Sequence, residues 1–247
     1  MNEFNILDKK IGSISDYNLR LNEAYNNGEP LVCTFVNPYS YPILSNLSNV
    51  VSRFNLVLSD GVMHTKLHNM FYPEKIERVS FDLSSIALEV LARAQEKGLS
   101  IAFIGTKSEY AKVLPKKLYD IFPNLNICYC RDGFFNSDME RLIIHEIDES
   151  CPDILVVGMG TPLQEEFLLK CVDKLTSVKE FYTCGGFLEQ TAVKGDYYPK
   201  IIKKTGLRWL YRALKHSHVR KRLVKEYPAF LYVYLKWHFK RQTRIKE

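Results

Sequence analysis

The sequence lacks a long hydrophobic run. None of its 247 residues belongs to a stretch that approaches the ~18–20 apolar residues of a membrane-spanning helix. The first five residues carry neither the basic nor the apolar part of a signal peptide. Low-complexity segments and repeats of 20–50 residues are also missing, which excludes a solenoid. We therefore expect a cytosolic globular protein.

Cysteine is sparse and irregularly spaced, at positions 33, 128, 130, 151, 171 and 184. Four of the six lie in or beside apolar strand-like runs, so buried reduced thiols are expected rather than a disulfide framework. Cys128 and Cys130 would share one face of a strand, but no second ligand pair follows, which argues against zinc. His64 and His68 have zinc-ligand spacing on a helix, but without a third ligand we expect a surface or supporting role. No metal site is predicted.

Several catalytic motifs are absent as well. The chain has no Ser-His-Asp arrangement and no phosphate loop ending in Gly-Lys-Ser/Thr. Gly158 and Gly160 supply the first two glycines of a dinucleotide fingerprint, but the third is missing and the motif comes late. An NAD(P)-dependent oxidoreductase is therefore the alternative interpretation, with Asp173 or Glu180 as its ribose-binding acid.

Charge is unevenly distributed along the chain. Residues 200–247 contain 15 Lys and Arg against two Glu, whereas the remainder has 19 basic and 26 acidic residues. Aromatic residues are interleaved with the basic ones from Pro228 to Phe239. This pattern favours contact with an anionic membrane surface, and an ordinary packed helical pair is the simpler alternative. The tail carries no nucleic-acid reader motif, so a nucleic-acid partner is not expected.

What the sequence does contain is an alternation of strand and helix patterns. Strands are predicted at 31–36, 54–58, 101–105, 126–130, 154–158 and 181–184, and helices at about 16–27, 83–97, 106–122, 138–149 and 164–175. Gly98 should end one helix, and Pro115 should kink or break the next. The pattern predicts an α/β fold: a Rossmann-like parallel sheet with helices on both faces over 1–195, and a basic helical appendage over 196–247.

The chain is organised around residues 153–166, where a buried strand stops at two glycines and a helix opens. Thr161 is predicted as the N-cap and Pro162 as part of the first turn. Glu165 would place a carboxylate near the positive helix end, and Gln164 would face a ligand. Open parallel sheets bind phosphorylated ligands where a strand end meets a helix N-terminus.

Other polar residues and glycines follow the predicted strands, and they should meet at the same edge of the sheet. They are Thr34, Asn37, Asp60, Gly105, Gly158, Gly160, Gln164 and Gly185. One carboxylate, amide and hydroxyl donors and backbone N–H groups suit the transfer of a group from a nucleotide-activated donor to an alcohol.

Four motifs in this order resemble the WecG/TagA/CpsF glycosyltransferase family. They are Thr-Phe-Val-Asn-Pro at 34–38, Ser-Asp-Gly at 59–61, Gly-Met-Gly-Thr-Pro-Leu-Gln-Glu at 158–165 and Gly-Leu-Arg-Trp-Leu-Tyr-Arg at 206–212. The similarity runs from about residue 31 to 227. Residues 78–82 and 189–193 depart from the family pattern near the donor, so the sequence leaves the donor sugar open.

The resemblance implies a metal-independent, inverting enzyme of surface polysaccharide synthesis that needs no cofactor. It would move a sugar, of the N-acetylmannosamine type, from a UDP donor to a polyprenyl-diphosphate-linked acceptor, on the inner face of the plasma membrane. Asp60 would be the base, and Thr34, Asn37 and Gln164 would hold the sugars. Donor contacts would come from Gly105, Gly158, Gly160, Gly185 and Glu165, and diphosphate contacts from Arg78, Arg212, Arg220 and Arg222. The resemblance also suggests a homo-oligomer.

Overall fold

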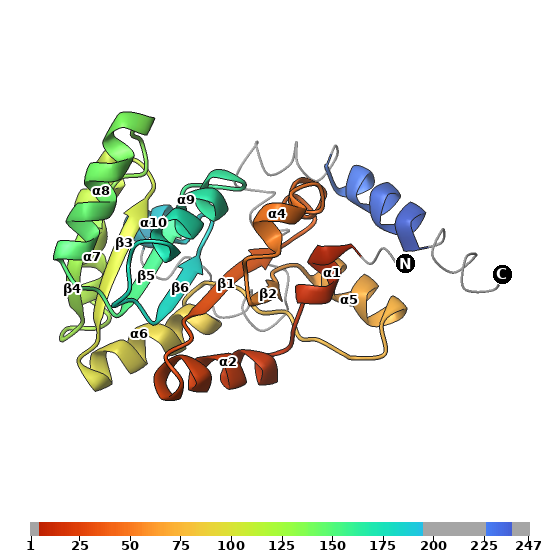
Figure 1. Ribbon diagram of the computed structural model, residues 1–247, viewed down its shortest axis with the longest axis horizontal. Coiled ribbons are helices and arrows are strands. Elements are labelled where there is room, and N and C mark those ends of the chain that lie inside the picture. Colours follow the sequence, from red (N-terminus) through yellow and green to blue (C-terminus); the bar gives the residue numbers. More distant parts are fainter. Residues whose placement is uncertain (1–4, 195–225, 239–247) are drawn as a thin grey trace.

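The computed structural model describes residues 5–194 and 226–238. Its centre is a six-stranded sheet in the order β2-β1-β6-β5-β3-β4, with every neighbouring pair parallel. The strands are β1 (Leu31–Val36), β2 (Leu56–Ser59), β3 (Ser100–Gly105), β4 (Asn126–Arg131), β5 (Ile154–Gly158) and β6 (Glu180–Thr183). The predicted parallel α/β sheet is confirmed, and Figure 1 shows helices on both of its sides.

The helices divide between the two faces of the sheet. One face packs against α2 (Ile14–Asn26), α6 (Ile86–Lys97), α7 (Ser108–Tyr119) and α10 (Phe187–Lys194). The opposite face packs against α1 (Ile6–Lys10), α3 (Tyr41–Leu44), α4 (Ser48–Val51), α5 (Val62–Phe71), α8 (Ser137–Glu149) and α9 (Leu163–Val172). The steps from β3 to β4 and from β5 to β6 run in opposite directions, so right-handed crossovers place α7 and α9 on opposite faces.

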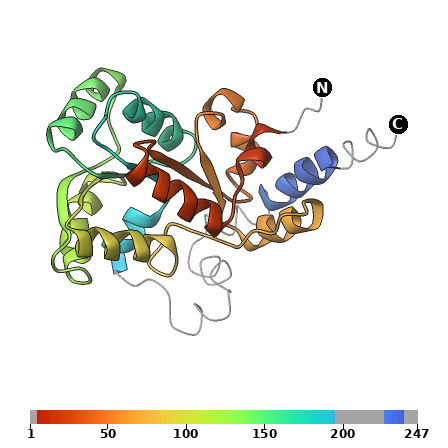
Figure 2. The same cartoon turned by 60° about the horizontal axis from the view of Figure 1, so that its bottom comes forward.

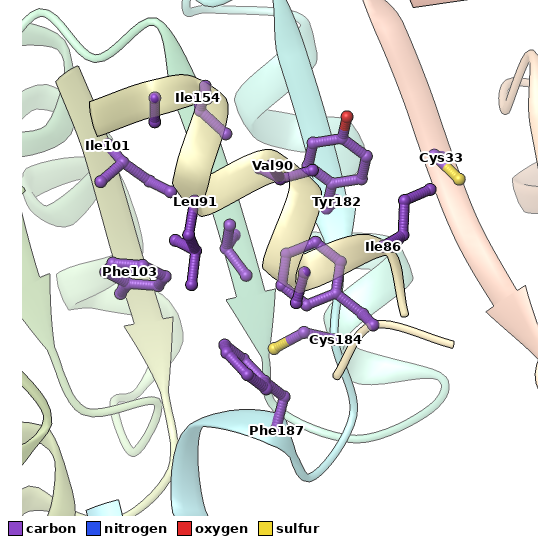
Figure 3. Close-up of a cluster of buried hydrophobic side chains, with 14 of the residues drawn as sticks. Cys33, Ile86, Val90, Leu91, Ile101, Phe103, Ile154, Tyr182, Cys184 and Phe187 are labelled. Carbon is purple, nitrogen blue, oxygen red and sulfur yellow. The ribbon is translucent and has the colours of Figure 1, made fainter. Parts of the chain in front are cut away.

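Strand residues alternate between two hydrophobic clusters, one on each face of the sheet. In β5, Ile154 belongs to the cluster beneath α6, whereas Leu155 belongs to the opposite cluster. Figure 3 shows Leu91 of α6 over Phe103 of β3, with Tyr182 of β6 nearby. Complete burial of such an aliphatic or aromatic side chain contributes about 1.5–3 kcal/mol. Burial on both faces explains why these strands read as continuous apolar runs.

The helix α7 continues through Pro115, where the sequence predicted a kink or a break. A proline at this position has no N–H for the carbonyl of Ala111, four residues earlier. The Cys130 thiol of β4 takes up that role, since its Sγ lies 3.4 Å from the Ala111 oxygen. The helix is therefore not broken at Pro115, and a neighbouring strand satisfies the carbonyl that proline leaves open.

The edge strand β4 contains an irregularity that separates its two thiols. Pairing with β3 skips one residue between Ile127 and Tyr129, and that residue is Cys128. Cys128 packs with the cluster on the α8 face, whereas Cys130 packs with the cluster on the α6 face. The prediction that both thiols share one face was therefore wrong, because a bulge shifts the alternation. All six cysteines are free, and Cys33 and Cys184 are buried as expected, whereas Cys128 and Cys130 are only half-buried and Cys151 is exposed.

Local chemistry explains the start of α2 and the end of α6. The helix α2 begins at Ile14, two residues before the predicted start, because Ser13 and Asp16 form a capping box. Hydrogen bonds from Ser13 hold the pKa of the Asp16 carboxyl below its usual range. The predicted stop after α6 is confirmed, since Gly98 has the left-handed φ of 65°. The short helices α1, α3 and α4, and the helix α10, have too few turns to show a helical period in the sequence.

A helix over residues 226–238 lies beside α5, as Figures 1 and 2 both show. Phe230 and Tyr234 are fully buried against the α5 face of the protein. The Tyr234 ring lies 5.9 Å from the His64 ring, and the His238 ring lies 4.7 Å from that of Phe71. The division predicted between 1–195 and 196–247 falls at residues outside the described ranges.

Candidate functional site

The predicted site residues follow strands that end at one edge of the sheet. Because all strands run parallel, the loops after β1, β2, β3, β5 and β6 leave from this edge. Gly105 and Gly158 pair in register at the ends of β3 and β5. Gly105 has a φ of 143°, and a Cβ built there would lie 2.3 Å from the Gly158 oxygen. A side chain at this position would displace the backbone that forms the edge.

Asp60 lies at the end of β2 and forms an ion pair with Arg78. The Arg78 Nη2 lies 2.7 Å from the Asp60 Oδ1, and both side chains are about one-third exposed. A second carboxylate, that of Asp82, lies 3.9 Å from the same nitrogen. The Val79 N–H donates to the Ser59 carbonyl at 2.9 Å, and this bond carries Arg78 alongside the end of β2. The structure thus brings together two predicted site residues that are 18 positions apart.

Asn37 lies in the loop beside Asp60. A Cβ built on Gly61 would lie 2.8 Å from the Pro38 ring and 3.5 Å from the Asn37 Cβ, so the two loops touch. The Asn37 Oδ1 accepts from the backbone N–H groups of Tyr39 and Ser40 at 2.9 and 3.1 Å. Within residues 5–194 and 226–238, its Nδ2 makes no hydrogen bond. The amide of Asn37 therefore offers a donor next to the carboxylate of Asp60.

Thr34 takes a different position from the one that a sugar contact requires. It is fully buried in β1, where its hydroxyl donates to the Glu165 Oε1 at 3.0 Å. The same hydroxyl lies 2.8 Å from the hydroxyl of Thr183 in β6. Thr34 therefore belongs to a hydrogen-bonded layer beneath the site edge.

Gln164 is also buried, and the structure turns it toward the protein rather than toward a ligand. Its Oε1 accepts from the backbone N–H groups of Gly160 and Gly185, each at 3.2 Å. Its Nε2 donates to the Glu165 Oε1 at 2.9 Å. The N–H groups of these two glycines therefore donate to a side chain of the protein in this structure.

Glu165 is fully buried, which removes it from direct contact with a donor in this conformation. Its Oε1 accepts from Thr34, Thr161 and Gln164, whereas its Oε2 has no hydrogen-bond partner. Burial raises the pKa of this carboxyl, and hydrogen bonds from Gln164 and Thr34 offset part of the rise. Pro162 occupies the N-cap position of α9, so the prediction of Thr161 as N-cap was wrong. The Thr161 hydroxyl donates to Glu165 instead, at 3.1 Å.

Two histidines near the site were predicted at the surface or in a supporting role, and both are buried in α5. The His64 Nδ1 lies 2.7 Å from the Ser59 Oγ, next to Asp60 in sequence. Burial lowers the pKa of His64 to about 3 and that of His68 to about 4, so both are neutral at physiological pH. One sequence feature could have predicted this cluster. Phe230, Tyr234 and His238 are spaced four residues apart, as are the two histidines of α5.

Three further predictions concern the diphosphate-binding arginines, a metal site and a membrane-spanning helix. Arg212, Arg220 and Arg222 lie outside the described residues. Among residues 5–194 and 226–238, no group of three or more His, Cys, Asp or Glu side chains could hold a metal ion. No helix in the same ranges has both the length and the apolar character needed to cross a bilayer.

The structure does not support the alternative of a nicotinamide-dependent oxidoreductase, because neither candidate for the ribose-binding acid lies beside the glycine loops. Glu180 begins β6, at the end of the strand away from the glycine loops, and it is buried against Arg93. Asp173 follows α9 and pairs with Arg53. Neither carboxylate lies at the edge where a ribose beside Gly158 would be bound.

Comparison with known proteins gives a family match and a curated relative. The model of the glycosyl transferase WecG/TagA/CpsF family matches residues 4–244. A curated protein of Shigella boydii, UDP-Gal:alpha-D-GlcNAc-diphosphoundecaprenol beta-1,4-galactosyltransferase, is 37% identical over 200 residues, which are 81% of this chain and 84% of the relative. Both matches cover the edge that carries Asp60, Arg78 and the glycine loops.

Proposed function

The chain belongs to the WecG/TagA/CpsF glycosyltransferase family, and from this premise we propose that it transfers a hexose from a UDP-sugar to a polyprenyl-diphosphate-linked acceptor. The observation that carries the proposal is the Asp60–Arg78 pair at the sheet edge, 2.7 Å apart. It lies in a chain that the family model covers almost from end to end. We assign the enzyme to the synthesis of a surface polysaccharide such as a capsule, an O-antigen or a teichoic acid.

The acceptor proposed here is N-acetylglucosamine linked through diphosphate to a polyprenol. The relative from Shigella boydii acts on such an acceptor and transfers galactose. Family resemblance favours a donor of the N-acetylmannosamine type, whereas 37% identity to the relative favours UDP-galactose. Because the identity extends over 200 residues, UDP-galactose is the first donor to test.

The proposed reaction is a single inverting displacement. The acceptor hydroxyl gives its proton to the Asp60 carboxylate while its oxygen forms a bond to the anomeric carbon. The bond from that carbon to the UDP oxygen breaks, and UDP leaves with the electron pair. UDP-galactose carries an α-linked sugar, so the β-1,4 product in the relative's name corresponds to inversion. Inversion in one step needs a base but no protein nucleophile.

The leaving diphosphate requires positive charge, and we assign that role to arginines rather than to a metal ion. Arg78 lies at the site edge, and planar guanidinium groups bind phosphate oxygens in pairs. The family resemblance adds Arg212, Arg220 and Arg222. Gly105, Gly158, Gly160 and Gly185 would let the donor approach the backbone closely, with Asn37 donating to a sugar hydroxyl.

The proposed enzyme works at the inner face of the plasma membrane, where its lipid-linked acceptor lies. The basic charge of residues 200–247 supports contact with anionic lipids. On the helix over 226–238, Tyr232 is 64% exposed on the side away from the buried Phe230. Flotation with anionic vesicles should recover the full chain and lose it when residues 200–247 are removed. Equal recovery would contradict a tail-borne contact. Sedimentation of the same samples measures the expected self-association.

The central experiment offers the purified chain a panel of UDP-sugars with a synthetic N-acetylglucosaminyl diphospholipid. Mass spectrometry should detect addition of one hexose with UDP-galactose, more slowly or not at all with the N-acetylmannosamine donor. Addition of EDTA should leave the rate unchanged. A preference for the N-acetylmannosamine donor would reverse the donor assignment, and no transfer from any UDP-sugar would overturn the proposed function.

A further inference from the structure

The loops after β5 and β6 are joined by a single side-chain oxygen. The Gln164 Oε1 accepts from the Gly160 N–H and the Gly185 N–H, both at 3.2 Å. These glycines lie 25 positions apart in sequence, and each follows a strand that ends at the site. Through these two bonds the side chain fixes the spacing between two loops that would flank a donor.

This bridge works in only one orientation of the Gln164 amide. A carboxamide has an accepting oxygen at one end and a donating NH₂ at the other. If the amide were reversed, its NH₂ would face two N–H donors, and the backbone N–H groups of Gly160 and Gly185 would lose this acceptor. An acceptor at the NH₂ end favours the same orientation and reinforces the bridge.

Glu165 supplies that acceptor, and the Thr161 hydroxyl is a second, more distant one, 3.4 Å from the Gln164 Nε2. Its Oε1 lies 2.9 Å from the Gln164 Nε2, and a carboxylate presents only acceptors to an NH₂. The same oxygen accepts from Thr34 at 3.0 Å and from Thr161 at 3.1 Å, so strand β1 and the start of α9 both fix its position. Contact with an acceptor leaves the carbonyl end of Gln164 facing the glycines.

A role in packing alone does not account for a carboxyl at position 165. It is fully buried, and within the described residues no Lys, Arg or His forms an ion pair with it. Its Oε2 has no hydrogen-bond partner. A buried carboxyl with neither a cation nor a full set of donors destabilises the fold. An apolar side chain would fill the same space more favourably, so stability alone does not explain the carboxyl.

We propose that Glu165 is a positioning residue for the reaction, which orients the Gln164 amide and thereby sets the spacing of the loops at Gly160 and Gly185. It touches no substrate itself. The inference rests on the proposed function, because it takes these loops to be the ones that receive the UDP-sugar. It replaces the direct donor contact that the sequence predicted for Glu165.

The first test separates donor binding from turnover. Glu165→Leu removes the acceptor and should raise KM for the UDP-sugar about tenfold, the equivalent of one to two lost hydrogen bonds, with kcat changed by less than threefold. Glu165→Gln keeps an acceptor oxygen and should stay within about threefold of wild type. The matched control is Tyr25→Phe, which removes one donor from the other buried glutamate, Glu180, and should leave KM unchanged.

The second test exchanges the two side chains. Gln164→Glu alone places a second carboxylate against Glu165 and should weaken UDP-sugar binding more than Glu165→Gln does. The double variant with Gln164→Glu and Glu165→Gln again pairs an NH₂ with an acceptor, and it leaves an oxygen facing both glycines. Recovery of donor KM in the double variant, relative to Gln164→Glu, is expected. Additive losses would overturn the proposed coupling.

A third measurement does not depend on catalysis, so it distinguishes failure of this inference from failure of the proposed function. The chain has four glutamines, at 95, 164, 190 and 242, so selective ¹⁵N labelling gives a simple spectrum of side-chain NH₂ groups. The Gln164 signal, identified by its absence in Gln164→Met, should exchange slowly with solvent in the wild type and rapidly in Glu165→Leu. An unchanged Gln164 signal in Glu165→Leu would contradict the inference whether or not transfer is observed.

Discussion

Two buried glutamates lie toward opposite ends of the sheet, and their surroundings differ in kind. Glu180, at the start of β6, meets Arg93 through two nitrogen–oxygen contacts of 2.6 and 2.7 Å. Hydroxyls of Tyr25 and Tyr182 complete its shell at 2.5 and 2.6 Å. Glu165, near the loops after β5 and β6, receives only neutral donors, all on one oxygen.

The difference indicates which network serves the fold and which serves the site. A buried charge that is fully paired and hydrogen-bonded rigidifies the structure around it. The Glu180 shell also links α2 to β6, because the Tyr17 hydroxyl lies 2.9 Å from that of Tyr182. Burial would lower the pKa of Arg93, but the hydrogen bonds and charge of Glu180 more than offset this, and the net direction is upward. The Glu165 network leaves one oxygen unsatisfied, which a purely structural network would avoid.

Asp60→Asn should produce the largest effect, and it lies at the Glu165 end of the sheet. An amide cannot take the acceptor proton, so transfer should fall by about 10²–10⁴-fold, the range of general-base contributions. Denaturant unfolding should change little, because the side chain is partly exposed. Wild-type turnover by this variant would remove Asp60 as the base.

Arg93→Met should show the opposite pattern, a large loss of stability without a specific loss of function. It leaves the Glu180 carboxylate buried without its cation, for which about 3–5 kcal/mol is a typical loss. Urea unfolding measures that change directly. Donor KM of the folded fraction should equal that of wild type, and a selective change in KM would mean that the two ends of the sheet are not independent.

Glu165→Gln should change the pH dependence of stability in a defined direction. Burial raises the pKa of Glu165 in the folded state, whereas the pKa of the carboxyl in the unfolded chain is about 4.3. Below that value both states are protonated, so the residue has no effect on relative stability. As the pH rises from about 4.3 through the folded-state pKa, ionisation destabilises the wild type and not the variant. The variant should therefore gain relative stability from pH 4 to 8, and a constant difference would contradict the burial assignment.

Tyr25→Phe should give the smallest effect. It removes one of several donors to Glu180, so a loss of about 1 kcal/mol is expected in urea unfolding. Thr34→Val, which removes a donor to Glu165, provides the comparison at the other end. If the hydrogen-bond network of Glu165 serves the site and that of Glu180 serves the fold, Thr34→Val should alter donor KM and Tyr25→Phe should not.

The fold could be predicted from the sequence because burial on both sheet faces produces continuous apolar strands between helical periods. Asp60 could be placed at the site edge because parallel strands share their carboxyl end, whereas Arg78 was predicted only from the family resemblance. The orientations of Gln164 and Glu165 could not be predicted, since they depend on α9 beginning at Leu163 and on hydroxyls from β1. The bulge at Cys128 likewise depends on pairing with another strand.

The most direct test of the central claim is to follow the complete reaction by ³¹P and ¹H NMR. The wild-type chain should consume one UDP-galactose per acceptor, release one UDP and produce a single new β-anomeric signal on the lipid-linked sugar. Release of UDP without a new glycosidic signal, or an α-anomeric product, would contradict inverting transfer to that acceptor.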